Sequence, residues 1–251
     1  MYPVLLQFGP FSLRTYGVLV SMALLLGYWI FLKETKRVGI DSEQASSALI
    51  LWVLLGLLGA RLYYMLAVDL LWVLRRPWDL PALWKGGLAI HGGVLGGILG
   101  VLWTVRKTRV PFATWADAAA PALALGQAVG RVGCFFAGCC YGKITHVPWA
   151  VVFTHPQSFA PPNLPLHPTQ LYEALLDLGI FGVLWGVRKR VRPGETFALY
   201  LILYGLVRLG VESLRWDRLT LGSRLSLAMI VSLSMVAAAS VWLILTRRKK
   251  P

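Results

Sequence analysis

Apolar residues along the chain gather into long runs that are separated by short polar segments. Seven of these runs are long enough for helices that cross a bilayer, because a hydrocarbon core requires about 20 apolar residues per helix. The runs cover residues 16–32, 47–68, 88–105, 112–130, 169–187, 196–214 and 225–246. The pattern predicts an all-α polytopic membrane protein with about seven transmembrane helices, folded as a single integral membrane domain over residues 1–251.

Three segments outside the runs have a distinct composition. Residues 1–15 contain two prolines and a glycine and are predicted to form an interfacial arm. Residues 131–168 form the longest connector and contain six prolines, which favours a loop over a further helix. Residues 247–251 form a short basic tail.

Basic residues are distributed unevenly over the connectors. The first, third and fifth connectors and the tail carry 14 of the 25 lysines and arginines, whereas the opposite side carries nine. Since the richer side faces the cytoplasm, we expect the N-terminus outside, the C-terminus in the cytoplasm and an external loop over residues 131–168. The net charge of +14 therefore fits topology signals and anionic lipid headgroups, and we expect no nucleic-acid partner.

Six ionisable residues lie inside the predicted spans, where each costs at least about 2.5–3.5 kcal/mol to insert. They are Arg61, Asp117, Glu173, Asp177, Arg208 and Glu212. Such residues face the interior of a membrane protein and usually serve a function.

The sixth span carries a stripe of polar residues. Tyr204, Arg208 and Glu212 are spaced four residues apart, and Arg215 returns to the same stripe, so the four fall within an arc of about 80° on a helix. One interpretation is an internal ion pair that only fixes packing. The other is the wall of a headgroup cavity, where an arginine forks two hydrogen bonds onto a phosphate.

The third span begins with His91 beside a row of glycines. Gly92, Gly96 and Gly100 lie on one helix face and predict close packing of another backbone. His91 is either structural or, because its neighbours lack side chains, placed to accept a proton near neutral pH.

Residues Gly126–Gly142 resemble the signature of the prolipoprotein diacylglyceryl transferases, which runs Gly-Arg-x-Gly-Asn-Phe-x-Asn-Gly-Glu-x-x-Gly. Five further segments resemble the same family in the same order, over about 200 residues in total. They are Tyr16-Gly17, Gly59-Ala60-Arg61, His91-Gly92-Gly93, His167–Glu173 and Tyr204–Arg215.

The resemblance implies an enzyme of the bacterial inner membrane with its active site toward the outer face. Its reaction moves the diacylglyceryl group of phosphatidylglycerol onto the lipobox cysteine thiol of a prolipoprotein, which forms a thioether and releases glycerol phosphate. The family uses no metal and no organic cofactor. Two alternatives stay open: a related lipid transferase with a different acceptor, and a lipid or anion transporter.

Roles follow from the resemblance and from the reaction. A thiol with a pKa of about 8.5 needs a base or a positive field to become a thiolate. A departing phosphate needs fixed cations to stabilise its charge. The predicted catalytic residues are His91, Arg131, Tyr204 and Arg208. Predicted to bind phosphatidylglycerol are Arg131, Gly133, Gly138, Gly142, Arg208 and Arg215. Predicted supporting residues are Tyr16, Arg61, His167, Tyr172, Glu173 and Glu212.

Three cysteines replace or extend the polar part of the signature. Where the family has two asparagines and a glutamate, this chain has Cys134, Ala137 and Cys139, and Cys140 adds a third thiol. The thiols could be inert, could form a disulfide from Cys134 to one of the others, or could carry a covalent intermediate. A metal site would need a fourth ligand from His146, His155 or His167, and we predict no metal.

Overall fold

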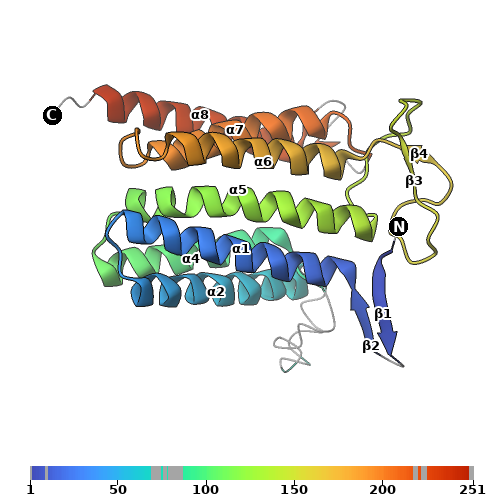
Figure 1. Cartoon of the computed structure of the whole chain (residues 1–251), viewed down its shortest axis with the longest axis horizontal. Coiled ribbons are helices and arrows are strands. Elements are labelled where there is room, and N and C mark those ends of the chain that lie inside the picture. Colours follow the sequence, from blue (N-terminus) through green and yellow to red (C-terminus); the bar gives the residue numbers. More distant parts are fainter. Residues whose placement is uncertain are drawn as a thin grey trace. The chain divides into compact units, whose positions relative to one another are not determined.

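The computed structural model describes residues 2–8, 11–68, 75, 78, 87–216, 220–221 and 225–248. Seven long helices of 18 to 27 residues run through this part of the chain (Figure 1). They are α1 (Thr15–Arg37), α2 (Ser42–Val68), α4 (Ile90–Thr108), α5 (Phe112–Ala137), α6 (Thr169–Val187), α7 (Glu195–Glu212) and α8 (Leu227–Arg248). Each coincides with one of the seven apolar runs, which confirms the helices predicted there.

Five of these helices, α1, α2, α5, α6 and α8, are long and apolar enough to cross a membrane. Helix α7 is of similar length but carries Glu195, Arg208 and Glu212. Helix α4 is made less apolar by its glycines and by Arg106 and Lys107 in its last turn. The chain is thus a polytopic helical membrane protein, and seven crossings with the predicted orientation stay a prediction.

Short strands occupy the segments beside the helices. The predicted arm contains an antiparallel hairpin of β1 (Val4–Phe8) and β2 (Phe11–Arg14), which leads directly into α1. Two smaller antiparallel pairs join β3 (Val151–Val152) to β4 (Pro165–Leu166) and β5 (Thr220–Leu221) to β6 (Leu225–Ser226).

The chain divides into two compact units, a first unit of residues 1–31 and 116–251 and a second unit of residues 32–115. In the second unit, α2 and α4 pack backbone to backbone through glycines. A Cβ on Gly92 would collide with the carbonyl oxygen of Gly59, and one on Gly96 would collide with that of Leu55. The close approach predicted for this glycine face is confirmed.

Arg61 ties α2 to the segment before α4 within the second unit. Its Nη1 atom donates a hydrogen bond of 3.2 Å to the carbonyl oxygen of Gly87, and its guanidinium lies 6.0 Å from the centre of the Tyr64 ring. Because the side chain is buried, these contacts give Arg61 a structural role.

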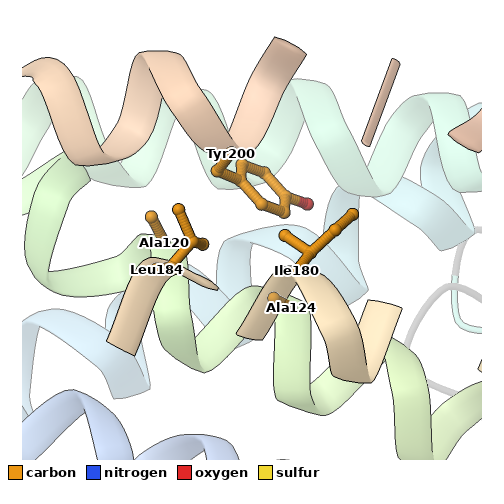
Figure 2. Packing of buried hydrophobic residues seen from close by; sticks show 5 residues of the cluster. All are labelled: Ala120, Ala124, Ile180, Leu184 and Tyr200. Atoms are coloured by element: carbon orange, nitrogen blue, oxygen red, sulfur yellow. The ribbon is translucent and has the colours of Figure 1, made fainter. Parts of the chain in front are cut away.

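The core of the first unit lies among α5, α6 and α7. Its buried side chains are Ala120, Ala124, Ile180, Leu184 and Tyr200, which converge on one another in Figure 2. The hydroxyl of Tyr200 donates a 2.9 Å hydrogen bond to Oε1 of Gln127. The small residues on α5 thus leave room for the large ring of Tyr200, whose hydroxyl is hydrogen-bonded inside the core.

Asp117 accounts for one of the charges predicted inside a span. Its carboxylate accepts hydrogen bonds from the backbone N–H groups of Gly194, at 2.6 Å, and Phe197, at 2.8 Å. Gly194 is the N-cap of α7 and Phe197 lies in its first turn, where N–H groups without an intrahelical acceptor and the helix dipole favour a negative charge. Asp117 therefore caps α7 from α5.

The predicted end of the fourth span at residue 130 is wrong, because α5 continues to Ala137. Arg131, Gly133 and Cys134 consequently lie on a helix, and the connector begins only at Gly138. The predicted span ended directly before Arg131, because a charged residue usually marks a membrane boundary. In the folded chain α5 continues past Arg131, and the charge of Arg131 is paired with Glu173.

Candidate active site

Four charged side chains from three helices form one ion-pair network in the first unit. Nε of Arg131 on α5 lies 2.5 Å from Oε2 of Glu173 on α6. The other oxygen of Glu173 lies 2.6 Å from Nη1 of Arg208 on α7, and Nη2 of Arg208 lies 2.9 Å from Oε2 of Glu212. Ser226 donates a 2.8 Å hydrogen bond to the remaining oxygen of Glu212. Glu173 is the link between the two arginines.

Exposure differs between the acidic and basic members of this network. The side chains of Glu173 and Glu212 are each 4% exposed, whereas those of Arg131 and Arg208 are 19% and 17% exposed. Two positive and two negative charges offset one another, which is the condition under which buried charges are tolerated. The guanidiniums of Arg131 and Arg208 are therefore the more exposed members of the network.

Tyr204 lies one turn before Arg208 on α7, as its spacing predicts. Its ring stacks on that of Tyr200, with centroids 5.8 Å apart and planes 16° from parallel. The stack connects the network to the apolar core of the first unit.

Asp177 is a buried carboxylate that the predicted site omitted. It follows Glu173 by one turn of α6 and is 1% exposed. Neither of its oxygens has a hydrogen-bond partner among the described residues. The sequence contained the signal, a charge inside an apolar run, but Asp177 belongs to none of the family motifs.

Arg215 does not continue the predicted stripe. Helix α7 ends at Glu212, and the chain then turns, so that Arg215 pairs with Gly142 in an antiparallel β-bridge. The prediction assumed a helix to residue 214, but apolar Leu214 belongs to the turn, where its carbonyl oxygen accepts a hydrogen bond from the N–H of Lys143. Arg215 is buried against the signature segment.

The three cysteines lie together at the end of α5. Their Sγ atoms are all within 4.8 Å of one another, and all three side chains are half-buried. The chain reverses at this point because Gly138, with φ 74°, and Cys140, with φ 62°, both adopt the left-handed region. Only a backbone held by its surroundings keeps a cysteine in that region.

Two buried side chains at the start of α6 hold the cysteine backbone. The Thr169 hydroxyl donates to the carbonyl oxygen of Cys140, and the Gln170 amide donates to that of Cys139, both at 2.7 Å. Thr169 is 1% exposed and Gln170 is fully buried. The cysteine turn is therefore fixed to the helix that carries Glu173.

The thiols differ in acidity because they donate to one another. Hydrogen bonds from the thiols of Cys134 and Cys139 lower the pKa of the Cys140 thiol, and the charges of Arg215 and Arg131 lower it further. Hydrogen bonding to Cys134 and Cys140 raises the pKa of the Cys139 thiol. Negative charge is thus favoured on Cys140.

His167 and Tyr172 lie close together at the entrance to α6. The Tyr172 hydroxyl accepts a 2.7 Å hydrogen bond from Nε1 of Trp149 and lies 3.2 Å from Nδ1 of His167. The supporting roles of His167 and Tyr172 stay a prediction.

The signature glycines are required by close packing within the first unit. A Cβ on Gly142 would lie 2.6 Å from the Cβ of His167 and 2.9 Å from the carbonyl oxygen of Leu214. A Cβ on Gly133 would lie 3.3 Å from the ring of Tyr16 on α1, and one on Gly138 would collide with the Ser158 hydroxyl. Binding of phosphatidylglycerol by these glycines stays a prediction.

His91 lies in the second unit, whereas Arg131 and Arg208 lie in the first. It is exposed in the first turn of α4, and its ring centroid is 5.8 Å from that of Tyr63. Its predicted role as proton acceptor stays a prediction.

An apolar groove of about 490 Å³ runs between α6 and α7 of the first unit. Its lining residues are Tyr172, Leu176, Leu206, Val207, Gly210, Val211 and Leu214. Tyr172, Val207 and Val211 are direct neighbours in sequence of Glu173, Arg208 and Glu212. The groove and the ion-pair network therefore share the same turns of the two helices.

Paired arginines beside an apolar groove, in a chain with five helices long and apolar enough to cross a bilayer, are typical of a membrane protein that handles an anionic lipid. The chain matches the family model "prolipoprotein diacylglyceryl transferase" over residues 3–245. It therefore belongs to the prolipoprotein diacylglyceryl transferase family, as the signature indicated.

Bacterial relatives cover almost the whole chain, and each is named a phosphatidylglycerol–prolipoprotein diacylglyceryl transferase. A relative from a Nostoc species is 38% identical, with 99% of this chain and 92% of its own length covered. Those from Clostridium tetani and Rhodospirillum rubrum are 36% and 35% identical. The matches cover 93% and 99% of this chain and 93% of each relative.

Proposed function

We propose that this enzyme transfers the diacylglyceryl group of phosphatidylglycerol to the lipobox cysteine thiol of prolipoproteins at the outer face of the bacterial inner membrane. The observation that carries this proposal is the pairing of Arg131 and Arg208 through Glu173, beside an apolar groove, in a chain of this family. The network suits the phosphate of the donor, and the groove suits one of its acyl chains.

The phosphate of the donor binds to the two guanidiniums. Arg131 contacts Glu173 through Nε, so its outer Nη atoms remain to fork onto phosphate oxygens. Arg208 uses both Nη atoms for Glu173 and Glu212, so it supplies charge and holds Glu173 in place. Arg215 adds positive charge near the signature segment, and the glycines there bring the backbone close to the headgroup.

In the chemical step, the acceptor sulfur attacks the glycerol carbon that is bonded to the phosphate oxygen. The S–C bond forms, the C–O bond breaks, and glycerol phosphate leaves with the electron pair of that bond. The arginines stabilise the negative charge that gathers on the leaving phosphate, a contribution that grows toward the transition state. His91 accepts the thiol proton, and Tyr204 lies on the polar face beside the phosphate.

Supporting residues hold these groups in position. Glu173 and Glu212 orient the arginines, while His167 and Tyr172 fix the entrance of α6. Tyr16 packs against the signature helix, and Arg61 braces the segment before His91.

Complementation tests the proposal. In a host depleted of its own transferase, the wild-type chain restores diacylglyceryl modification of a reporter lipoprotein, and Arg131→Ala or Arg208→Ala abolishes it. Arg106→Ala, at an exposed position of α4, is the matched control and retains it. Full activity of either arginine variant contradicts the phosphate assignment. Failure of a well-inserted wild-type chain favours a transferase with another acceptor or a transporter.

A further inference from the structure

The proposed function, as described above, assigns no role to the cysteine turn at residues 134–140. Three Sγ atoms converge from the last turn of α5 and the two residues that follow Gly138. In Zn²⁺ sites the metal–sulfur distance is about 2.3 Å, which places tetrahedrally arranged sulfurs about 3.8 Å apart. Sulfurs that already lie within 4.8 Å of one another need only a small contraction to reach that arrangement.

We propose that Cys134, Cys139 and Cys140 form a three-thiolate site for Zn²⁺, whose fourth coordination position is open to the thiol of the acceptor. This replaces our expectation that the chain binds no metal. The metal site stands on the cysteine geometry alone, whereas the identity of the fourth ligand rests on the proposed function.

Backbone geometry and polar contacts preorganise the cluster. Cys140 adopts a left-handed conformation that non-glycine residues rarely take, and this turns its side chain back toward Cys134. Thr169 and Gln170, both buried, hold the carbonyl groups of Cys140 and Cys139. Ligands fixed by surrounding hydrogen bonds are a property of metal sites, since such contacts orient the donor atoms before the ion arrives.

Charge balance also favours a metal at this position. Three thiolates and one Zn²⁺ ion carry a net charge of −1, and the positive charges of Arg131 and Arg215 act on the cluster. Three thiolates without a metal would place three negative charges in a half-buried site, which is costly. The same arginines therefore offset the charge that remains after the metal binds.

The number of ligands separates an open site from a closed one. No histidine nitrogen or carboxylate oxygen among the described residues lies within 4.8 Å of all three sulfurs. Structural zinc sites have four protein ligands, whereas sites that act on a substrate keep one position free. Three thiolates favour a metal that binds sulfur well, and such a metal also accepts a further sulfur ligand at the free position.

An acceptor thiol at this position gains the activation that the reaction requires. On binding it gives up its proton to a base, since a thiol that coordinates Zn²⁺ is deprotonated. The sulfur then attacks the glycerol carbon as described above, with glycerol phosphate leaving with the C–O electron pair. Cys134 and Cys139 stand where the family signature has an amide and the carboxylate, so this chain would activate the thiol by coordination instead.

Metal analysis of the purified full-length chain tests the site directly. In detergent with a non-chelating phosphine reductant, the wild-type protein is expected to hold about one zinc ion per chain, as in other thiolate sites. Cys134→Ser and Cys139→Ser lower the zinc content to background, while His155→Ala, a matched control in the same loop, leaves it unchanged. Zinc below a tenth of this level, or equal zinc in the serine variants, overturns the proposal.

Cobalt substitution gives a measurement that does not depend on the variants. Reconstitution of the wild-type chain with Co²⁺ produces thiolate-to-cobalt absorption with the intensity of three ligands, and a lipobox peptide shifts the visible bands. The same peptide with serine in place of cysteine leaves them unchanged. If the cysteine peptide does not shift the bands, the proposed open fourth position is wrong. If the cysteines form a disulfide and the reduced protein binds no metal, the proposed metal site is wrong. Neither measurement uses transfer activity, so failure here leaves the proposed function standing.

Discussion

Glu173 bridges Arg131 and Arg208, with Oε2 at 2.5 Å from Nε of the first and Oε1 at 2.6 Å from Nη1 of the second. A single carboxylate from α6 thus joins α5 to α7 at the level of the apolar groove. Because the Glu173 side chain is only 4% exposed, solvent does not replace it if it is lost.

Glu173→Gln is expected to destabilise the protein strongly. The substitution keeps the shape of the buried Glu173 side chain but removes the counter-charge that the two guanidiniums share. Removing one partner of a fully buried ion pair costs about 3–5 kcal/mol, which is the upper limit here. Thermal or denaturant unfolding in detergent measures the change. Glu43→Gln, at an exposed position of α2, serves as control. A Glu173→Gln variant as stable as the control contradicts the bridging role.

Lysine substitutions separate charge from hydrogen-bond geometry at the arginines. Arg131→Lys keeps the positive charge but loses the planar fork, so transfer is expected to fall by about 10²–10³-fold, as for loss of one transition-state donor. Arg106→Lys, on the exposed face of α4, is expected to leave the rate unchanged. The measurement is the rate of lipid transfer to a lipobox peptide at matched protein levels. An Arg131→Lys variant with the wild-type rate excludes a forked contact.

The helices were predictable because hydrophobicity acts locally. Apolar runs near residues 169–187 and 225–246 match α6 and α8 within two residues at each end. The glycine face of α4 was predictable too, since its spacing alone places Gly92 and Gly96 on one side. In the site, the Arg208–Glu212 pair followed from the four-residue spacing.

Features that depend on distant residues were not predictable from the sequence. Helix α5 continues to Ala137 past Arg131, whose charge is paired with Glu173, 42 residues further along the chain. Arg215 left the predicted stripe because it pairs with Gly142 across a turn. The convergence of the three thiols depends on two left-handed residues that no hydrophobic pattern encodes.

Asp117→Ala is expected to lower the stability of the protein through loss of a helix cap. The N–H groups of Gly194 and Phe197 at the start of α7 lose their acceptor, and losing an N-terminal cap typically costs about 0.5–2 kcal/mol. Asp117→Asn retains an acceptor oxygen and is expected to fall between the wild type and the alanine variant. Unfolding in detergent ranks the three proteins, and an alanine variant equal to the wild type rules out the cap.

Two glycines of α4 give a matched pair for the packing of the second unit. A Cβ on Gly92 would collide with the backbone of Gly59, whereas a Cβ on Gly97 has no neighbour within 4 Å. Gly97→Ala is therefore expected to stabilise the protein by up to about 1 kcal/mol, because alanine favours a helix. Gly92→Ala is expected to destabilise it, since the two backbones must separate. Thermal unfolding of the two variants side by side measures the difference, and a shift of equal sign contradicts the backbone contact.

Asp177→Asn is expected to change stability in the opposite direction to Glu173→Gln, although both replace a carboxylate with an amide on α6. Glu173 has two arginine partners, whereas the buried oxygens of Asp177 have no hydrogen-bond partner among the described residues. A buried acceptor without a partner costs about 1–3 kcal/mol, and more if charged, so removal of the charge relieves that cost. The melting temperature of Asp177→Asn in detergent should therefore rise above that of the wild type. A fall would mean that the Asp177 carboxylate is stabilised in its buried position and is held there by a contact with a positive charge.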